Sequence, residues 1–286
     1  MTDTIHAIKH PFRLGLGEGQ YVDRFVYSYI LLGEKIFLVD TGVTTTSALL
    51  QNELKNHGRS IQEVSLVLLT HAHPDHIGGC LRIKENSSAT FAIHPADKSW
   101  VEDVEKQRHE RPIPNFFELV GGSVPIDRGL KEGDIISWDK GKSIRVIETP
   151  GHSPGSVSFF CEEEGALFSG DAIPASGTIP VYVDPQASIR SIQKLKKVPG
   201  VKHLFSSWHE PISGNQIHKI MDEGIRYIEK IDEIVSDLSK TMPLETSGDE
   251  LSLRALERMG IKMNKVLYMV MTSFESHRQK PAGDNL

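Results

Sequence analysis

The chain has 286 residues, of which 38% are hydrophobic and 24% charged, with a formal net charge of −6 and a pI near 6.1. These values are ordinary for a globular protein with a full core, and they exclude an electrostatic preference for nucleic acid or an anionic membrane. Two cysteines without paired spacing, no apolar leader and no apolar run of membrane-spanning length predict a protein of the cytoplasm.

The first half of the chain predicts strands that alternate with helices. Apolar β-rich runs and helical spacing of leucines give these elements, with glycines at the turns. The predicted elements are a hairpin of strands over 25–32 and 36–39, a helix over 47–57, and strands over 64–69 and 90–93.

The segment from about residue 100 to 122 interrupts this alternation, because it is first charged and then rich in proline and aromatic residues. We expect it to be an insertion that forms an active-site lid or a dimer contact. Phe116 and Phe117 would supply an apolar anchor for either role, and a surface excursion without a role is the alternative.

The second half continues with strands and then becomes helical. The predicted elements are strands over 135–138, 144–148, 157–161, 166–168 and 202–205, and helices over 187–198, from 216 onward, over 251–259 and over 264–274. The long apolar stripe that starts after residue 216 has charged residues opposite it, as in an amphipathic helix. We therefore expect one domain over 1–215 and a helical extension over 216–286.

The run Thr70-His71-Ala72-His73-Pro74-Asp75-His76-Ile77-Gly78-Gly79 is the most informative part of the sequence. It places four metal-binding side chains within six residues, directly after a buried strand, and Gly-Gly allows a sharp turn behind them. Ordinary packing does not account for such a cluster. The run therefore predicts a metal-binding loop.

Three later residues also follow predicted strands and are candidate ligands. His152 lies in a loop of glycine and proline, Asp171 ends the strand over 166–168, and His209 follows the strand over 202–205. Each has a plain alternative as a packed loop histidine, a strand-end cap or a surface residue. We expect His71, His73 and His152 to hold one metal ion, Asp75, His76 and His209 to hold a second, and Asp171 to contact both.

These ligands indicate hydrolytic chemistry. A nitrogen-rich set without thiolate suits two divalent ions, zinc first, with iron or manganese also tolerated. A hydroxide that bridges the ions would attack a polarised carbonyl, and Asp75 would carry the proton to the leaving group.

The motif, preceded by Asp40-Thr41-Gly42 and followed by Gly151-His152, Ser169-Gly170-Asp171 and His209, resembles the metallo-β-lactamase-fold hydrolase superfamily, in its glyoxalase II and lactonase-like branch. The resemblance covers roughly residues 20 to 212. It implies an αββα sandwich of two mixed sheets flanked by helices. It also implies that Asp40, together with Thr70 of the motif, supports the ligands by hydrogen bonds rather than by contact with metal.

The resemblance implies a hydrolase of a small carbonyl ester, either a thioester or a lactone. Asp171 stands where antibiotic-hydrolysing members carry Cys or Ser, and His73 stands where flavodiiron proteins carry Glu. The alternatives are a mononuclear iron enzyme like the persulfide dioxygenases, a phosphodiester or sulfate ester hydrolase of the same superfamily, and a non-catalytic scaffold. We expect Phe116, Phe117 and Tyr182 to line the pocket for a small-molecule substrate. The chain could also form a homodimer, which the sequence does not decide.

Overall fold

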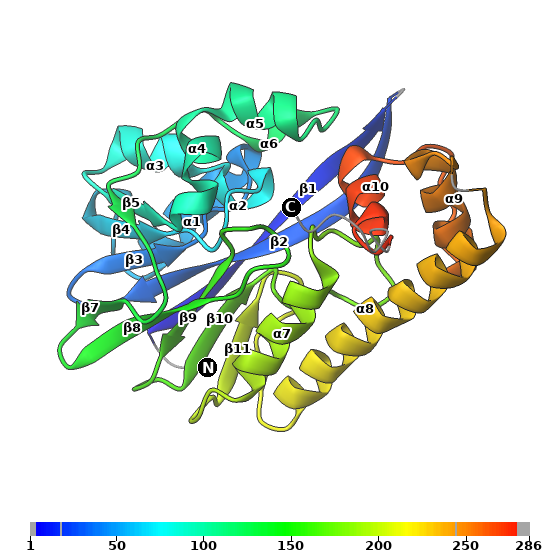
Figure 1. Cartoon of the computed structure of the whole chain (residues 1–286). Coiled ribbons are helices and arrows are strands. Elements are labelled where there is room, and N and C mark those ends of the chain that lie inside the picture. Colours follow the sequence, from blue (N-terminus) through cyan, green and yellow to red (C-terminus); the bar gives the residue numbers. More distant parts are fainter. Residues whose placement is uncertain (1–3, 18, 244, 279–286) are drawn as a thin grey trace.

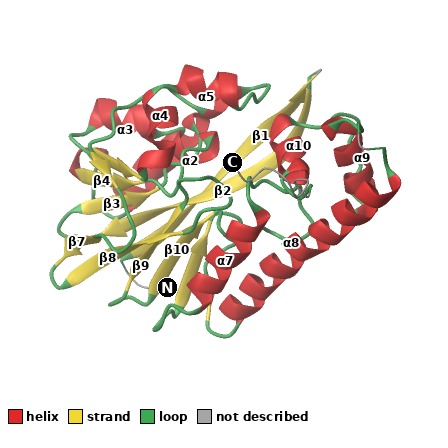
Figure 2. Cartoon of the chain, in the orientation of Figure 1, coloured by secondary structure: helices red, strands yellow, loops and turns green. Residues whose placement is uncertain are grey.

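The structure is a computed structural model that describes residues 4–17, 19–243 and 245–278. Within this part of the chain, two six-stranded sheets face each other, and helices cover their outer faces (Figure 1, Figure 2). The predicted αββα sandwich of two mixed sheets is therefore confirmed.

The first sheet has the strand order β1-β2-β3-β4-β5-β6. In this sheet β2 runs antiparallel to both β1 and β3, whereas β3 to β6 are parallel to one another. The strands are β1 (Ile5–Gly17), β2 (Gln20–Leu32), β3 (Ile36–Val39), β4 (Val64–Leu68), β5 (Thr90–Ile93) and β6 (Arg128–Gly129). The parallel part brings the carboxyl ends of β3, β4 and β5 to one edge of the sheet, where Asp40 and the histidine motif follow.

The second sheet has the order β12-β11-β10-β9-β8-β7, and only β10 and β11 are parallel neighbours. The strands are β7 (Ile135–Asp139), β8 (Lys142–Glu148), β9 (Val157–Cys161), β10 (Ala166–Gly170), β11 (His203–Ser206) and β12 (Ile212–Ser213). Because His152 follows β8 and Asp171 follows β10, the second sheet also presents its candidate ligands at strand ends.

The helices of the described residues lie mainly outside the two sheets. They are α1 (Ser47–Asn56), α2 (Pro74–Ile77), α3 (Cys80–Asn86), α4 (Pro95–Glu102), α5 (Val104–Glu110), α6 (Phe116–Leu119), α7 (Pro185–Lys196), α8 (Gln216–Thr241), α9 (Gly248–Arg258) and α10 (Tyr268–Glu275), with 3-10 turns η1 (Thr44–Thr46) and η2 (Ile61–Glu63). Figure 1 shows α3, α4 and α5 beside the first sheet and α7 and α8 beside the second. None of the helices described here has both the length and the apolar character that a bilayer crossing requires.

The period of two along each strand separates two hydrophobic cores. Tyr29 and Leu31 of β2 point between the sheets, where they join Phe159 of β9 and Phe168 of β10. Ile30, between them in sequence, belongs instead to the core under the helices. Burial on both faces explains why the strands read as continuous apolar runs rather than as alternating ones.

Strand β1 is the element that the sequence analysis did not anticipate. Its 13 residues include Lys9, Pro11 and Arg13, which hide the strand pattern. An edge strand tolerates proline and charge because one side of its backbone has no partner. The long β1–β2 hairpin reaches toward the carboxyl-terminal helices, as Figure 1 shows.

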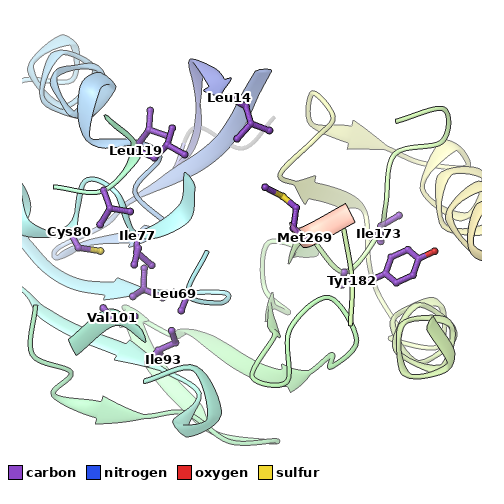
Figure 3. Packing of buried hydrophobic residues seen from close by; sticks show 14 of the residues in the cluster. Leu14, Leu69, Ile77, Cys80, Ile93, Val101, Leu119, Ile173, Tyr182 and Met269 are labelled. Carbon is purple, nitrogen blue, oxygen red and sulfur yellow. The ribbon is translucent and has the colours of Figure 1, made fainter. Parts of the chain in front are cut away.

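The segment 100–122 and the helices after residue 216 both pack into the main structure. Phe116 and Leu119 of α6 share one hydrophobic cluster with Ile228 of α8 and Phe274 of α10. Figure 3 shows Leu14 of β1, Leu119 of α6 and Met269 of α10 as members of this cluster. A boundary at residue 215/216 stays a prediction, because this cluster runs across it.

Candidate metal centre

The histidine motif begins where β4 ends, and its backbone turns at once into the short helix α2. Gly78 follows that helix at a close approach of two chain segments. A Cβ at Gly78 would collide with the carbonyl oxygen of Leu119 and lie 2.7 Å from the backbone nitrogen of Thr44. The motif therefore needs glycine here so that the loop can pack under α6 and hold its histidines still.

One group of candidate ligands consists of His71, His73 and His152. Their ligand atoms all lie within 4.8 Å of one another, and all three side chains are buried. His152 Nε2 lies 2.7 Å from His73 Nδ1, although the two residues are 79 positions apart in sequence. The first sheet supplies two of these histidines and the second sheet supplies the third.

A second group consists of His71, His76 and Asp171, whose ligand atoms also lie within 4.8 Å of one another. Asp171 Oδ1 is 3.2 Å from His76 Nε2, and Asp171 Oδ2 is 3.3 Å from His152 Nε2. The carboxylate of Asp171 therefore lies between the two groups, one oxygen toward each.

Three atoms of this cluster are buried without a hydrogen-bond partner: His71 Nε2, His76 Nε2 and Asp171 Oδ1. Buried polar atoms are nearly always paired, because an unpaired one costs about 1–3 kcal/mol. Nitrogen and carboxylate oxygen are also suitable donors for zinc and related divalent ions. The donor set thus fits a metal, and a bound ion would satisfy all three atoms.

Hydrogen bonds on the far side of the rings determine which nitrogen faces the cluster. His76 Nδ1 donates to Asp40 Oδ2 at 2.9 Å, and His152 Nδ1 donates to the carbonyl oxygen of Val181 at 2.6 Å. Thr70 Oγ1 donates to Asp40 Oδ2 at 2.8 Å, so it is an acceptor for His71 Nδ1 at 3.0 Å. In each of these three imidazoles the lone pair that faces the site is consequently on Nε2.

Asp40 is also held in an unusual backbone conformation, with φ of 58°. Its Oδ1 accepts a hydrogen bond from the Thr70 backbone nitrogen at 2.8 Å. The left-handed conformation is uncommon for residues other than glycine and is best tolerated by Asp and Asn. In this conformation the carboxylate of Asp40 accepts three hydrogen bonds, which offset the backbone strain.

Burial and nearby charge set the protonation of the cluster. Burial, followed by the charge of His76, lowers the pKa of His71 well below its usual range. Burial would also lower the pKa of His76, but the carboxylates of Asp171 and Asp40 outweigh it and raise that pKa well above the usual range. A proton on His76 and a metal ion therefore compete for the same Nε2 atom.

Two predicted ligands lie outside these groups. Asp75 Oδ2 is 3.8 Å from His76 Nε2, and the carboxylate lines the adjoining cavity. His209 is half-buried, and its Nδ1 is 3.1 Å from Ser206 Oγ. The structure therefore gathers five of the seven predicted ligands into two overlapping triplets, and the metal roles of Asp75 and His209 stay predictions.

Asp97, at the start of α4, supports the site but was not anticipated. It is buried, and it accepts hydrogen bonds from Ser153 Oγ at 2.6 Å, Gly155 N at 2.9 Å and Ala72 N at 3.3 Å. It thereby ties the loop of His152 to the histidine motif. The available signal was its place just past the carboxyl end of β5, where the same sheet presents its other polar residues.

A cavity opens beside the cluster. Its wall includes Asp75, His73, His152 and Asp171, and the rest is largely apolar. The apolar and cationic residues that line it are Phe12, Leu14, Arg24, Phe25, Arg111, Ile113, Leu119, Pro174, Ala175, Ile179, Val181, Trp208 and Met269. Most come from the β1–β2 hairpin, the segment after α5, the loop after β10, and α10.

The three predicted pocket residues lie in different places. Phe116 is packed in the core, and Phe117 is 50% exposed with its ring near Arg108. Tyr182 lines a second, smaller pocket that is also lined by His73, His152 and Arg111, and its hydroxyl is 2.8 Å from His277 Nε2. None of the three lines the larger cavity, and their roles as pocket walls stay predictions.

An αββα sandwich with a buried histidine and aspartate cluster at the strand ends of both sheets defines a protein that can hold metal. The chain belongs to the metallo-beta-lactamase superfamily, because the model of that family matches residues 21–203. This agrees with the resemblance that the motifs carry.

The chain also aligns with curated relatives, at sequence identities between 26% and 30% over the aligned segments of the three described here. A "Beta-lactamase-like protein 2 homolog" of Caenorhabditis elegans is 29% identical over 76% of this chain and 65% of the relative. A hydroxyacylglutathione hydrolase of Hyphomonas neptunium is 30% identical over 58% of this chain and 59% of the enzyme. A Brucella anthropi enzyme of the same name is 26% identical over 80% and 72%. The chain thus spans less than two thirds of the first two relatives.

Solved structures show the same fold. A metallo-beta-lactamase family protein from Thermus thermophilus has a TM-score of 0.73 and 23% identity, with 96% of this chain and 92% of that chain covered. The subclass B3 metallo-beta-lactamase BJP-1 of Bradyrhizobium japonicum has a TM-score of 0.59 and 19% identity, covering 76% and 90%. At these identities the likeness concerns the fold alone.

Proposed function

We propose that the protein is a metal-dependent hydrolase of a small carbonyl ester, with a thioester favoured over a lactone. His71, His73 and His152 would hold one divalent ion, Asp75, His76 and His209 a second, and Asp171 both. Zinc is the expected metal, and iron or manganese are compatible with the same donors.

The observation that carries the proposal is the set of buried, unpaired atoms in the cluster. His71 Nε2, His76 Nε2 and Asp171 Oδ1 lie close together beside the cavity that Asp75 lines. A proton on His76 would let its Nε2 donate to Asp171 Oδ1 at 3.2 Å, but it would leave His71 Nε2 without a partner. A bound ion would satisfy all three atoms, and a non-catalytic scaffold would gain nothing from this arrangement.

The metal, when bound, would polarise the substrate carbonyl and make water available as a nucleophile near neutral pH. The protein's own residues do the rest. Asp40 and Thr70 hold the rings of His76 and His71, and the apolar part of the cavity wall would keep bulk water from a bound substrate. Asp75 lines the cavity, which supports its proposed role of carrying a proton to the leaving group.

The relatives favour a thioester among the carbonyl esters. Two of the compared enzymes are hydroxyacylglutathione hydrolases, and an acyl group joined to the glutathione sulfur is a thioester. We place the protein in the cytoplasm, and Cys80 and Cys161 support a reducing compartment because both are free and buried.

The experiment combines metal analysis with a substrate panel. Protein purified without added metal is analysed for zinc, iron and manganese, and the same sample is assayed on a thioester, a lactone, a phosphodiester and a sulfate ester. We expect zinc to predominate and the thioester to turn over fastest.

Other outcomes are equally informative. A single iron per chain, with consumption of oxygen in the presence of a persulfide, would replace the hydrolase with a dioxygenase. Fully metal-loaded protein that hydrolyses none of the panel would refute the proposal.

A further inference from the structure

Arg111 is a buried cation that the proposed chemistry leaves unexplained. The residue follows α5, is 8% exposed and lines the cavity beside the cluster. Within residues 4–17, 19–243 and 245–278, its guanidinium has one hydrogen-bond acceptor, Met269 Sδ at 3.4 Å, and no carboxylate within 4.0 Å. Buried arginines are normally paired with an anion, because an isolated buried charge is costly.

The nearest sources of negative charge do not account for this arginine. Asp75 and Asp171 act on Arg111 through space, but they face the metal cluster and are proposed ligands there. Metal ions would compensate both carboxylates. Burial lowers the pKa of Arg111 to about 10, so the guanidinium stays charged at neutral pH. The cavity would then hold a positive charge without a partner.

Arg24 adds a second cation to the same cavity. Its guanidinium lies 6.0 Å from the ring centre of Trp208, and it also has no carboxylate within 4.0 Å among the described residues. Asp23 is the remaining acidic residue of the wall, but its side chain is exposed. The two arginines therefore leave the cavity electropositive once Asp75 and Asp171 are compensated.

Apolar side chains make up much of the cavity that Arg111 lines. Leu14, Leu119 and Met269 are among them, and Figure 3 shows Met269 opposite the two leucines. A guanidinium set among such side chains fits a ligand that is apolar along its length and anionic at one end, because the fork of N–H groups matches two oxygens of an anion.

We propose that Arg111 is the anion subsite of the substrate cavity and binds a carboxylate at the far end of the substrate's acyl chain. This rests on the proposed function, and it narrows the substrate to a thioester or ester whose acyl part is a dicarboxylic acid. A singly charged carboxylate suits the site better than a phosphate dianion, because its desolvation in an apolar wall is less costly.

The test uses two matched pairs of compounds. The first pair is the succinyl and the butyryl thioester of N-acetylcysteamine, which differ only in the terminal carboxylate. The second pair is the corresponding unreactive thioethers, with a carboxypropyl or a butyl group on sulfur. Kinetics on the thioesters and calorimetric binding of the thioethers are measured on the metal-loaded protein as purified.

The variants are Arg111→Gln and the control Arg108→Gln. Arg108 lies on α5 just before Arg111, is half-exposed and pairs with Glu105 at 2.9 Å. We expect wild type and Arg108→Gln to prefer the carboxylate compound in both pairs by about tenfold or more, as a charge-assisted contact implies. Arg111→Gln should lose this preference, mainly through KM, and keep its affinity for the butyl thioether.

The other results would overturn the subsite or the proposed function. Wild type without a preference, or Arg111→Gln that retains it, would overturn the proposal, and so would equal loss of both thioethers. Tighter binding of a phosphonopropyl thioether would replace the carboxylate by a phosphate group. Preferential binding of the carboxypropyl thioether without hydrolysis of either thioester would leave the subsite standing and refute the hydrolase.

Stability separates a binding role from a structural one. If the charge serves a ligand, Arg111→Met should unfold at the same or a higher temperature than wild type, because a buried unpaired charge is removed from the free protein. A marked drop in melting temperature would assign Arg111 to the fold and overturn the proposal. Should Arg111→Gln fail to fold, Arg111→Lys keeps the charge without the fork and should show a reduced preference.

Discussion

Replacing Asp40 by Asn tests how the protein prepares His76 for metal. The carboxylate of Asp40 accepts from Thr70 N, Thr70 Oγ1 and His76 Nδ1 at 2.8, 2.8 and 2.9 Å. Asn fits the same left-handed backbone and has almost the same volume, so the perturbation is confined to hydrogen bonding. The NH2 group of Asn can donate a hydrogen bond but cannot accept one. Whichever way the amide points, either Thr70 N or the pair Thr70 Oγ1 and His76 Nδ1 therefore loses its acceptor.

The consequence depends on the orientation of the new amide. With the oxygen kept toward Thr70 N, the NH2 group faces His76 Nδ1, and the ring must move its proton to Nε2. A protonated Nε2 cannot bind metal. Loss of such a supporting contact lowers metal affinity about 10–100-fold, which corresponds to about 1.4–2.8 kcal/mol. With the amide reversed, the buried N–H of Thr70 loses its acceptor, which costs about 1–3 kcal/mol of folding stability.

Zinc affinity is measured by competition with a coloured chelator, and the stability of the metal-free protein is measured by thermal unfolding. The control is Asp127→Asn, which weakens an acceptor of one backbone N–H, that of Phe91, on the same sheet away from the cluster. We expect weaker zinc binding or lower metal-free stability in Asp40→Asn alone. Wild-type values of both quantities in Asp40→Asn would refute the tautomer argument, as would an equal loss of zinc affinity in the control.

Three further predictions follow from the described contacts. His71→Ala should abolish zinc loading and turnover, whereas His94→Ala should change neither, because His94 caps α4 and is not among the grouped ligands. Metal analysis and kinetics measure both quantities, and equal losses in the two variants would show that the assignment is wrong. Burial lowers the pKa of His10 to about 4, so its contribution to the free energy of unfolding should be full above about pH 6.5 and fall by about 3 kcal/mol on acidification to about pH 4. His10→Gln should therefore reduce the slope of the chelated protein's stability over this pH range, and an unchanged slope would contradict the prediction. Gly78→Ala should lower the melting temperature strongly, because the new Cβ would meet fixed backbone atoms. Gly129→Ala should lower it only mildly, because its Cβ would be 3.3 Å from a ring carbon of a proline. Equal midpoints in the denaturation curves of the two variants would show that the loop can move.

The sequence was sufficient for the fold class and for the loops that carry the grouped candidate ligands, because both depend on local patterns. Short apolar runs bounded by glycine predicted most strands, and a strand followed by closely spaced histidines predicted the metal loop. The position of His152 could also be predicted, since glycine and proline hold its loop at a strand end. Such features need no knowledge of which segments meet in space.

His209 shows the limit of the strand-end argument. A residue past a strand lies near the correct edge of the sheet, but the direction of its side chain depends on the conformation of the loop. Here the ring of His209 is beside Ser206, and the structure does not group it with His76. The pocket walls were beyond prediction for a related reason, since the cavity forms only where β1, α10 and the segment after α5 meet.

Arg111 differs from these cases, because the sequence contained a signal for it. The charged run around α5 suggests a solvated helix, yet Val104 and Gln107 of α5 and Arg111 directly after it recur at intervals of three and four residues and are all buried. Such spacing buries a charged residue beside a valine only if that side of the helix meets something polar. Gln107 meets the carbonyl oxygen of Ala72 in the metal loop. Arg111 meets only a sulfur atom in the described chain, and so the missing polar partner must come from the ligand that we propose it binds.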